Sequence, residues 1–258
     1  MPPPMLSHEV RGIRTRMMRG GAGEPMVFLH GAGGMAPWGA FAETLASRFD
    51  LIMPEHPGFG GSDTPASIRN VQDMALYYLD FLDALGGPRV HLAGTSLGGW
   101  IAASLAVRNC TQLASLSLLA PAGLRVKGIP SGDNFIWNPQ ETARNLFHDQ
   151  AFAEAALAAQ PTPDEQDMLL KNRFMATKLG WEPRWHDPAL ERWLHRIKVR
   201  TLILWGAEDK LFPAAYAAPW GAGIAGSRVE IIPRAGHLLH IEKAGAAAEK
   251  IVSFAGGR

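Results

Sequence analysis

The stretch Val90-His-Leu-Ala-Gly-Thr-Ser-Leu-Gly98 runs from an apolar segment into a turn of small residues. Residues 90–93 are typical of a buried strand, and apolar residues at helical spacing over 97–108 predict a helix. Ser96 therefore lies in a sharp turn between a strand and a helix, with glycines two positions before and after it. Such a turn strains the serine backbone and raises its hydroxyl above the helix N-terminus. An ordinary glycine-rich turn is the alternative, but this placement favours a nucleophile.

Strands and helices alternate on both sides of this turn. Short apolar runs bounded by Gly or Pro predict strands over residues 26–29, 51–53, 113–119, 201–204 and 229–232, and helical spacing predicts helices over 38–48 and 71–85. Most of the runs lack polar alternation, as expected for strands covered on both faces. The pattern predicts an α/β fold with a mostly parallel central sheet flanked by helices, and residues 7–19 fit a hairpin at its edge.

The alternation stops between residues 122 and 197, where no strand is predicted. Asn138-Pro-Gln-Glu and Thr162-Pro-Asp-Glu each combine a capping residue, a proline at the first helical position and a glutamate at the third. Asp187-Pro188 repeats the first two features, so we expect three helix starts. We interpret residues 122–197 as a helical cap inserted into an α/β core formed by residues 1–121 and 198–258.

The composition is that of a globular protein, with 258 residues, 47% hydrophobic and 19% charged side chains. The 25 Lys and Arg and 24 Asp and Glu give a net charge of +1, which offers no basic surface for nucleic acid. Cys110 is the one cysteine, and neither a signal peptide nor the roughly 20 apolar residues of a membrane span is present. We expect a cytoplasmic protein with a small-molecule substrate, whether monomer or homo-oligomer.

A second glycine-rich turn, Leu29-His-Gly-Ala-Gly-Gly34, also follows a predicted strand. Its glycines allow backbone N–H groups to face inward, as the binding of a developing oxyanion requires. Turns of this kind also bind phosphate, but no Lys-Ser/Thr pair follows as in a P-loop, and no GxGxxG pattern is present. An oxyanion site is therefore favoured over a nucleotide site.

A serine nucleophile needs a base, and the base needs an orienting acid. Trp205-Gly-Ala-Glu-Asp209 and Ala235-Gly-His237 each follow a predicted strand directly. Asp209 and His237 are thus expected at the carboxyl ends of strands, where open α/β sheets place their sites. The order along the chain is nucleophile Ser96, acid Asp209 and base His237.

Taken together, these motifs resemble the α/β-hydrolase family over essentially the whole chain. The resemblance rests on five elements in the family's order: His30-Gly31, Glu55-His-Pro-Gly-Phe-Gly-Gly-Ser-Asp63, Gly94-Thr-Ser-Leu-Gly98, Trp205-Gly-Ala-Glu-Asp209 and Gly236-His237. In this family the second element often begins with Asp, so Glu55 is a small departure to which we assign no chemistry. The five elements in this order are far more specific than any one of them.

The resemblance implies that Ser96 attacks a carbonyl, that His237 transfers the proton to the leaving group, and that Asp209 orients and stabilises the imidazolium. Glu208, beside Asp209, is the alternative acid, which the family spacing disfavours. A serine at position 96 also disfavours dehalogenation and epoxide opening, for which related enzymes use an aspartate nucleophile. Carbonyl chemistry remains.

The resemblance also implies an oxyanion hole built from the backbone N–H groups of Leu97 and Ala32, with Gly33 as the alternative to Ala32. His30 is expected to order this loop through hydrogen bonds rather than to take part in the chemistry. No cofactor is implied, and the histidines show no metal-ligand spacing with cysteines or carboxylates.

Substrate specificity is expected to reside in the cap. Trp137 and Met175 are candidates for lining an apolar acyl pocket, although they could equally hold the cap to the core. Arg173 is a candidate for binding a substrate carboxylate, because a lid arginine near this place does so in the similar carbon–carbon hydrolases of meta-cleavage pathways. A solvated arginine is the alternative. That subfamily tends to carry Trp after the catalytic histidine, whereas this chain has Leu238.

The sequence therefore predicts a lidded serine hydrolase that cleaves carboxylic esters of small to medium apolar acids through an acyl-enzyme on Ser96. Carbon–carbon bond hydrolysis of meta-cleavage products is the first alternative, and lactonase or perhydrolase chemistry would use the same three residues. A ligand receptor that relays to a partner protein is the alternative from outside the enzymes.

Overall fold

The computed structural model describes residues 2–257. Their strands form one sheet of eight. The strands are β1 (Met5–Val10), β2 (Ile13–Gly20), β3 (Glu24–Leu29), β4 (Phe49–Pro54), β5 (Val90–Thr95), β6 (Leu113–Leu119), β7 (Thr201–Gly206) and β8 (Arg228–Ile232). Every strand predicted from the sequence is present. The predicted edge hairpin is formed by β1 and β2, which Arg11 and Gly12 join in left-handed conformations.

The strand order across the sheet is β1-β2-β4-β3-β5-β6-β7-β8. The pairs β1–β2 and β2–β4 are antiparallel and all the other pairs are parallel, so the prediction of a mostly parallel sheet is confirmed. Because β3 and β5 are parallel neighbours, the glycine-rich turn after β3 lies beside the serine turn after β5. This adjacency brings the two motifs to one edge of the sheet.

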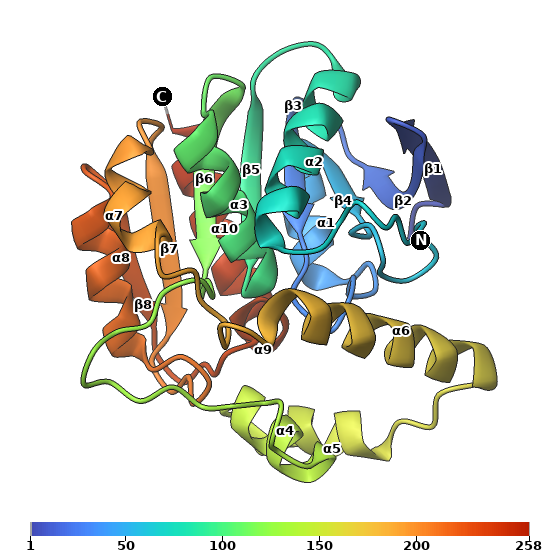
Figure 1. The fold of residues 1–258 in the computed structure, drawn as a ribbon, viewed down its shortest axis with the longest axis vertical. Helices are drawn as coiled ribbons and strands as arrows, with labels where there is room; N and C mark the ends of the chain where they lie inside the picture. The colour runs from blue at the N-terminus through green and yellow to red at the C-terminus, as the bar shows by residue number, and fades with distance from the viewer. Residues whose placement is uncertain (1, 258) are drawn as a thin grey trace.

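Helices cover both faces of the sheet (Figure 1). One face carries α2 (Val71–Leu85), α3 (Leu97–Arg108) and α8 (Ala217–Gly223), and the other carries α1 (Ala40–Ala46) and α10 (Ala244–Gly256). The short α9 (Leu239–Glu242) precedes α10, and the 3-10 turn η2 (Ala214–Tyr216) precedes α8. Both faces of the parallel strands are therefore buried, which explains why their sequences lack polar alternation.

No strand of the sheet comes from residues 120–200 (Figure 1). The helices of this segment are α4 (Pro139–Leu146), α5 (Gln150–Ala158), α6 (Pro163–Gly180), α7 (Leu190–Trp193) and the 3-10 turn η1 (Leu194–Arg196). Asn138 and Thr162 each form a complete capping box at α4 and α6, as their sequences predict. In Figure 1, α4 and α5 lie at the lower end of the molecule, toward which the arrows of β6 and β7 point, and α6 lies above them, below α2.

The helices of residues 122–197 differ from the prediction in two details. The prediction did not include α5, which follows α4 after a short turn and whose N-cap is Asp149. It also placed a helix start at Asp187-Pro188, whereas the Asp187 carboxylate accepts the Ala189 N–H in a turn and α7 begins at Leu190. The carboxylate of Asp187 thus makes a contact of the capping kind, and the regular helix begins two residues later than predicted.

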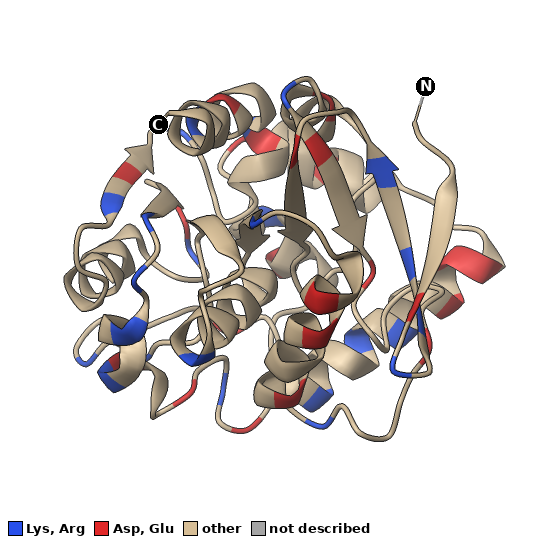
Figure 2. Ribbon diagram, turned by 90° about the horizontal axis from the view of Figure 1, so that it is seen from above, with Lys and Arg blue, Asp and Glu red and all other residues tan. Residues whose placement is uncertain are grey.

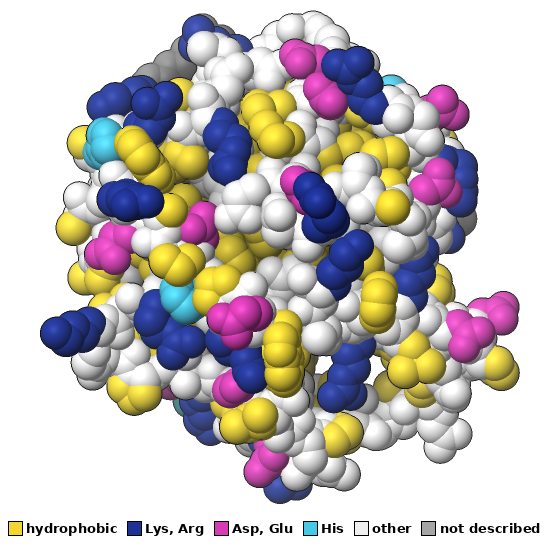
Figure 3. All heavy atoms as spheres, in the orientation of Figure 1, with side chains coloured by type: hydrophobic (Ala, Val, Ile, Leu, Met, Phe, Trp, Pro, Cys, Tyr) yellow, Lys and Arg dark blue, Asp and Glu magenta, His cyan; other side chains and the backbone are white. Residues whose placement is uncertain are grey.

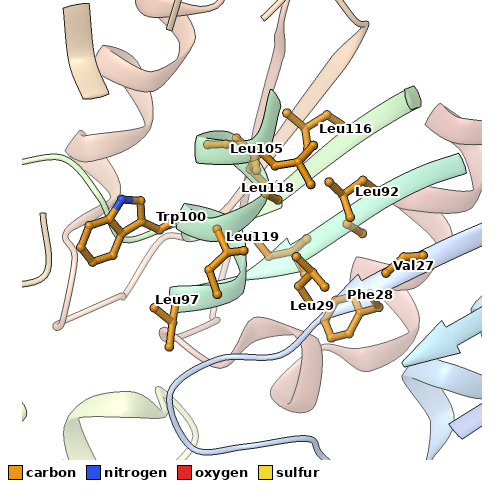
Figure 4. Packing of buried hydrophobic residues seen from close by; sticks show 14 of the residues in the cluster. Val27, Phe28, Leu29, Leu92, Leu97, Trp100, Leu105, Leu116, Leu118 and Leu119 are labelled. Carbon is orange, nitrogen blue, oxygen red and sulfur yellow. The ribbon is translucent and has the colours of Figure 1, made fainter. Parts of the chain in front are cut away.

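The central core lies between the sheet and α3 (Figure 4). Apolar side chains of β3, β5, β6 and α3 contribute to it, and Phe28 packs against Phe41 of α1 on the other face of the sheet. The labelled residues are Val27, Phe28, Leu29, Leu92, Leu97, Trp100, Leu105, Leu116, Leu118 and Leu119. Each of these ten side chains is at most 2% exposed. The serine turn is therefore anchored by a tightly packed strand before it and a buried helix after it.

Charged side chains of both signs are interspersed around the outer elements (Figure 2). This arrangement agrees with the near-zero net charge of the sequence. Within residues 2–257, no helix has the length and apolar character needed to cross a membrane.

Candidate active site

Ser96 occupies the turn between β5 and α3 in a strained conformation, with φ 52° and ψ −115°. The flanking glycines are sterically required, because a Cβ on Gly94 would lie 2.4 Å from the Gly98 oxygen and one on Gly98 would lie 2.1 Å from the Leu29 oxygen. Backbone strain of this kind persists only where the surroundings fix it. The strand–turn–helix context predicted for the serine is present.

The three residues that the sequence singled out lie in hydrogen-bonding contact. His237 Nε2 is 2.9 Å from Ser96 Oγ, and His237 Nδ1 is 2.8 Å from Asp209 Oδ2. All three side chains are buried, with Ser96 the most exposed at 8%. This is the arrangement of a nucleophile, a base and an orienting acid.

Asp209, rather than its neighbour Glu208, contacts the histidine. The loop after β7 directs Asp209 Oδ2 to His237, while Oδ1 accepts the backbone N–H groups of Leu211 (2.8 Å) and Phe212 (2.9 Å). Glu208 instead accepts the Ala235 N–H at 2.9 Å. The two carboxylates thus bind different groups: Asp209 binds the His237 ring, and Glu208 binds the backbone two residues before His237.

The glycine-rich turn after β3 lies against the serine turn. An ideal Cβ on Gly31 would be 3.5 Å from Ser96 Cβ, and the Gly34 N–H donates to the Gly31 carbonyl at 3.1 Å. The backbone N–H groups of Ala32, Gly33 and Leu97 donate to no other atom of residues 2–257. Three backbone donors near Ser96 are therefore available to an oxyanion, and the choice between Ala32 and Gly33 stays open.

A buried histidine pair supports this turn. His30 Nδ1 donates to the Gly31 carbonyl at 2.7 Å, and His30 Nε2 accepts the His56 N–H at 3.0 Å. His56 Nε2 donates back to the His30 carbonyl at 2.9 Å, and its Nδ1 accepts the Tyr78 hydroxyl at 2.5 Å. The expected role of His30 in ordering the loop agrees with these contacts, and each ring nitrogen has a defined role as donor or acceptor.

Burial keeps these histidines neutral. It lowers the pKa of His30 to about 4, and it lowers the pKa of His56 well below its usual range, with a further contribution from His30. His240 is also buried, and burial, with a smaller electrostatic contribution from the neighbouring His237, lowers the pKa of His240 to about 3. These groups hold the site in shape without taking up protons near neutral pH.

A cavity of about 850 Å³ opens at Ser96 and His237. Its wall is mainly apolar and comes from the glycine-rich turn, α4, α5, α6 and the loop after β8, with Met35, Phe135, Leu146, Phe147, Leu157 and Leu169 among its residues. Figure 3 shows a hollow low on this face, where Figure 1 places α6 above α4 and α5. The size and lining suit a small or medium apolar ligand.

Two of the three proposed substrate contacts lie on this cavity. Trp137 and Arg173 line it, and no salt bridge of the described residues involves the Arg173 guanidinium. Met175 is not among the lining residues, because its side chain is fully buried and packs against Gly58. Leu238, where the similar carbon–carbon hydrolases tend to have Trp, also lines the cavity.

Sequence reasoning missed two polar residues that hold the site together. Glu242 accepts three backbone N–H groups, those of Gly236 (2.7 Å), His148 (3.2 Å) and Asp149 (2.5 Å). Asn172 joins α6 to the glycine-rich turn. Glu242 could have been found from its place in the sequence, five residues after His237. Nothing in the sequence near Asn172 indicates a partner 139 positions away.

No group of three or more His, Cys, Asp or Glu side chains within residues 2–257 is arranged to hold a metal ion. The residues at Ser96 bring together a hydroxyl, an imidazole, a carboxylate and backbone N–H groups. These groups suffice for acyl transfer.

Comparison with known proteins agrees with this geometry. The family model of the alpha/beta hydrolase fold matches residues 24–244. The 2-hydroxymuconate semialdehyde hydrolase of Pseudomonas sp. strain CF600 is 29% identical over 263 residues, which cover 94% of this chain and 90% of that protein. A crystal structure of a bacterial membrane phospholipase A superimposes with a TM-score of 0.79 at 26% identity, covering 98% of this chain and 86% of that one.

A longer relative matches in part. The dihydrolipoyllysine-residue acetyltransferase component of the acetoin cleaving system of Cupriavidus necator is 30% identical over 249 residues. The match covers 92% of this chain but 65% of that protein, so this chain spans a little less than two thirds of the relative's length.

Proposed function

Because this chain belongs to the α/β-hydrolase family, we propose that it is a serine hydrolase that cleaves carboxylic esters of small to medium apolar acids. The observation that carries the proposal is the hydrogen-bonded array of Ser96, His237 and Asp209, whose serine opens on a large, mainly apolar cavity. A carbonyl carbon is the electrophile that such a serine attacks, and an apolar wall suits an acyl chain.

The first half of the reaction acylates Ser96. His237 Nε2 takes the Ser96 proton as Oγ attacks the carbonyl carbon, and the carbonyl oxygen becomes an oxyanion. The backbone N–H groups of Leu97 and of Ala32 or Gly33 stabilise that oxyanion. When the carbon–oxygen bond to the alcohol breaks, His237 gives its proton to the leaving oxygen, and an ester of Ser96 remains.

The second half returns the enzyme to its starting state. Water takes the place of the alcohol and gives a proton to His237 Nε2 as its oxygen attacks the acyl carbon. The bond from that carbon to Ser96 Oγ then breaks, and His237 returns the proton to Oγ. Throughout the cycle Asp209, held by two backbone N–H groups, keeps Nδ1 of the imidazole protonated.

Residues 122–197 form a cap in this proposal, inserted into a core of residues 1–121 and 198–258. Support comes from α4, α5 and α6, which supply much of the cavity wall. The acyl group is bound against this wall, with Trp137 among its contacts. The lengths of acyl chain that the enzyme accepts then depend on how these three helices pack.

The nucleophile is tested by covalent labelling and by turnover. An organophosphonate is expected to add one label to the wild type, and Ser96→Ala is expected to abolish both the label and the hydrolysis of p-nitrophenyl esters. Residual catalysis over water is limited to roughly 10³–10⁴-fold, which the oxyanion hole and binding supply. Mass spectrometry and initial rates check this, and unchanged turnover in Ser96→Ala would end the proposal.

A second candidate is hydrolysis of a carbon–carbon bond in a vinylogous diketone acid. The observation that favours it is Arg173, an exposed cation on the cavity wall without an acidic partner among the described salt bridges. A substrate carboxylate would pair with this guanidinium. The similarity to a 2-hydroxymuconate semialdehyde hydrolase supports this candidate, and Leu238 in place of the subfamily's Trp opposes it.

Arg173→Met separates the two candidates, because it keeps much of the bulk and removes the charge. We expect turnover of neutral short-chain esters to change less than about threefold. A charge-assisted contact contributes on the order of 1.5–3 kcal/mol, so kcat/KM for a carboxylated diketone should fall roughly 10- to 150-fold if that substrate is accepted. Initial rates on both substrates and thermal melting check this, and equal losses on both would assign Arg173 a structural role.

A further inference from the structure

Helix α6 contacts the glycine-rich turn through one buried side chain. The Asn172 amide nitrogen donates to the Gly33 carbonyl at 3.1 Å, and its amide oxygen accepts the Gly60 N–H at 2.8 Å. The residue is 8% exposed, and both polar atoms of the amide are paired. A helix outside the sheet therefore reaches directly into the loop that supplies an oxyanion donor.

The Asn172 contact completes the fixing of one peptide unit. In the unit that joins Gly33 and Gly34, the N–H donates to the Gly31 carbonyl at 3.1 Å and the C=O accepts from Asn172. Gly34 has φ +101°, and a Cβ at this position would lie 2.4 Å from Asn172 Nδ2. The amide is thus packed against the turn as well as bonded to it, and the turn cannot rotate about this peptide without breaking the bond.

The orientation of this peptide determines where the neighbouring N–H groups point. Ala32 and Gly33 are the central residues of the turn closed by the bond from Gly34 to Gly31, and both line the cavity at Ser96. Their N–H groups have no partner within residues 2–257. A donor contributes to an oxyanion hole only when it is already aimed at the developing charge.

A second side chain, that of Lys171 next to Asn172, also attaches α6 to the core. Lys171 Nζ donates to the carbonyls of Gly60 (2.9 Å) and Ser62 (2.7 Å), and it does not line the cavity. Lys171 and Asn172 thus both bind the turn around Gly60, but only Asn172 also binds the glycine-rich turn. This difference makes Lys171 a matched control for simple docking of the helix.

We propose that Asn172 is a positioning residue for the oxyanion hole, which holds the Gly33 carbonyl so that the N–H groups of Ala32 and Gly33 face the carbonyl oxygen of the substrate. The inference rests on the proposed function, since an oxyanion forms only if Ser96 attacks a carbonyl. It makes completion of the oxyanion hole depend on one side chain of α6, that of Asn172, rather than on the attachment of the helix in general. A cap that carries this helix therefore sets transition-state stabilisation as well as the shape of the cavity.

Asn172→Asp is the sharpest test, because aspartate keeps an acceptor for the Gly60 N–H and loses the donor to the Gly33 carbonyl. We expect kcat for a short-chain p-nitrophenyl ester to fall about 10- to 100-fold with KM within about threefold, since loss of a whole donor costs roughly 10²–10³-fold. Affinity for a trifluoromethyl ketone, which forms an oxyanion on Ser96, should fall by a similar factor. Affinity for the product carboxylic acid should change less than threefold.

Lys171→Met is the control, and it should leave kcat and trifluoromethyl ketone affinity within about threefold of wild type. Should Asn172→Asp melt far below wild type, Asn172→Ala provides the same comparison without a buried charge. Equal losses in the Lys171 and Asn172 variants, or a loss confined to KM, would overturn the inference while phosphonate labelling of Ser96 still supports the proposed function. A wild type that neither hydrolyses esters nor labels would overturn the proposed function, and the inference with it.

Discussion

At the scale of single residues, one carboxylate is directed to the histidine and its neighbour to the backbone. Asp209 has 0% side-chain exposure and satisfies two backbone N–H groups besides the imidazole of His237. Its position is therefore set before any substrate binds. Glu208 takes the Ala235 N–H and so holds the backbone two residues before His237. The loop after β7 thus supports the histidine in two independent ways.

Asp209→Asn and Glu208→Gln should consequently differ widely in effect. An asparagine keeps the shape of Asp209 but favours the wrong imidazole tautomer, so we expect kcat to fall on the order of 10⁴-fold. Glutamine at position 208 still offers an oxygen to the Ala235 N–H, and we expect kcat within about threefold of wild type. Initial rates on one ester test the pair. A larger loss in Glu208→Gln than in Asp209→Asn would exchange the two roles.

At the scale of elements, hydrogen bonds connect the turn between α4 and α5 to the loop that carries His237. Glu242 of α9 accepts the N–H of Gly236 in that loop and those of His148 and Asp149 in the turn. The Leu238 N–H also donates to the Leu146 carbonyl at 3.2 Å. Asn172 likewise bonds α6 to the glycine-rich turn, so helices of residues 138–180 are joined to two of the loops that meet at Ser96.

Glu242→Gln tests how much these hydrogen bonds of Glu242 stabilise the fold. The glutamine amide has one acceptor oxygen, so at least one of the N–H groups of Gly236, His148 and Asp149 faces an NH₂ group in a buried place. Leaving a buried donor unsatisfied costs about 1–3 kcal/mol, and we expect the free energy of unfolding to fall by that amount. Urea unfolding measures it. The neighbouring exposed Glu249, substituted by Gln, should change stability by less than about 0.5 kcal/mol. Similar effects in the two variants would contradict the role of Glu242.

The sequence predicts the parts of this site that depend on local pattern. Ser96, Asp209 and His237 lie one, three and five residues after the ends of β5, β7 and β8, so their meeting follows from strand order and direction. Met175 shows the limit of such reasoning, because it lies on α6 as expected and yet faces Gly58 rather than the cavity. Which side of a helix faces a ligand depends on how the helix packs. Contacts such as Asn172 with Gly33 join positions 139 apart and leave no local trace.

At the scale of the whole molecule, neutral histidines are part of the native structure. His30 and His56 each use one ring nitrogen as a donor to a backbone carbonyl and the other as an acceptor, and these contacts hold the glycine-rich turn. His240 lies buried against the rings of Phe28 and Phe41. A proton on any of these rings would remove an acceptor or bury a charge. The fold therefore depends on the pH range in which these rings stay neutral.

This dependence predicts a loss of stability in acid. The pKa of His30 falls to about 4 and that of His240 to about 3 in the folded chain, both because of burial, against about 6.5 in the unfolded chain. Below pH 6.5 the unfolded state therefore binds more protons. The stabilisation is complete above pH 6.5 and is lost as pH falls through the folded pKa values. Each histidine contributes a slope of about 1.4 kcal/mol per pH unit within this window.

His240→Gln isolates one of these contributions. Glutamine does not titrate, so between pH 6 and pH 4 the free energy of unfolding should fall with pH less steeply than in wild type, by about 1.4 kcal/mol per pH unit. The variant loses some stability at pH 7, so the slope rather than the absolute value is the quantity to compare. Urea unfolding at pH steps of half a unit provides it. Parallel curves for wild type and variant would show that His240 takes up its proton equally in both states, and the buried, neutral role assigned to it would then be wrong.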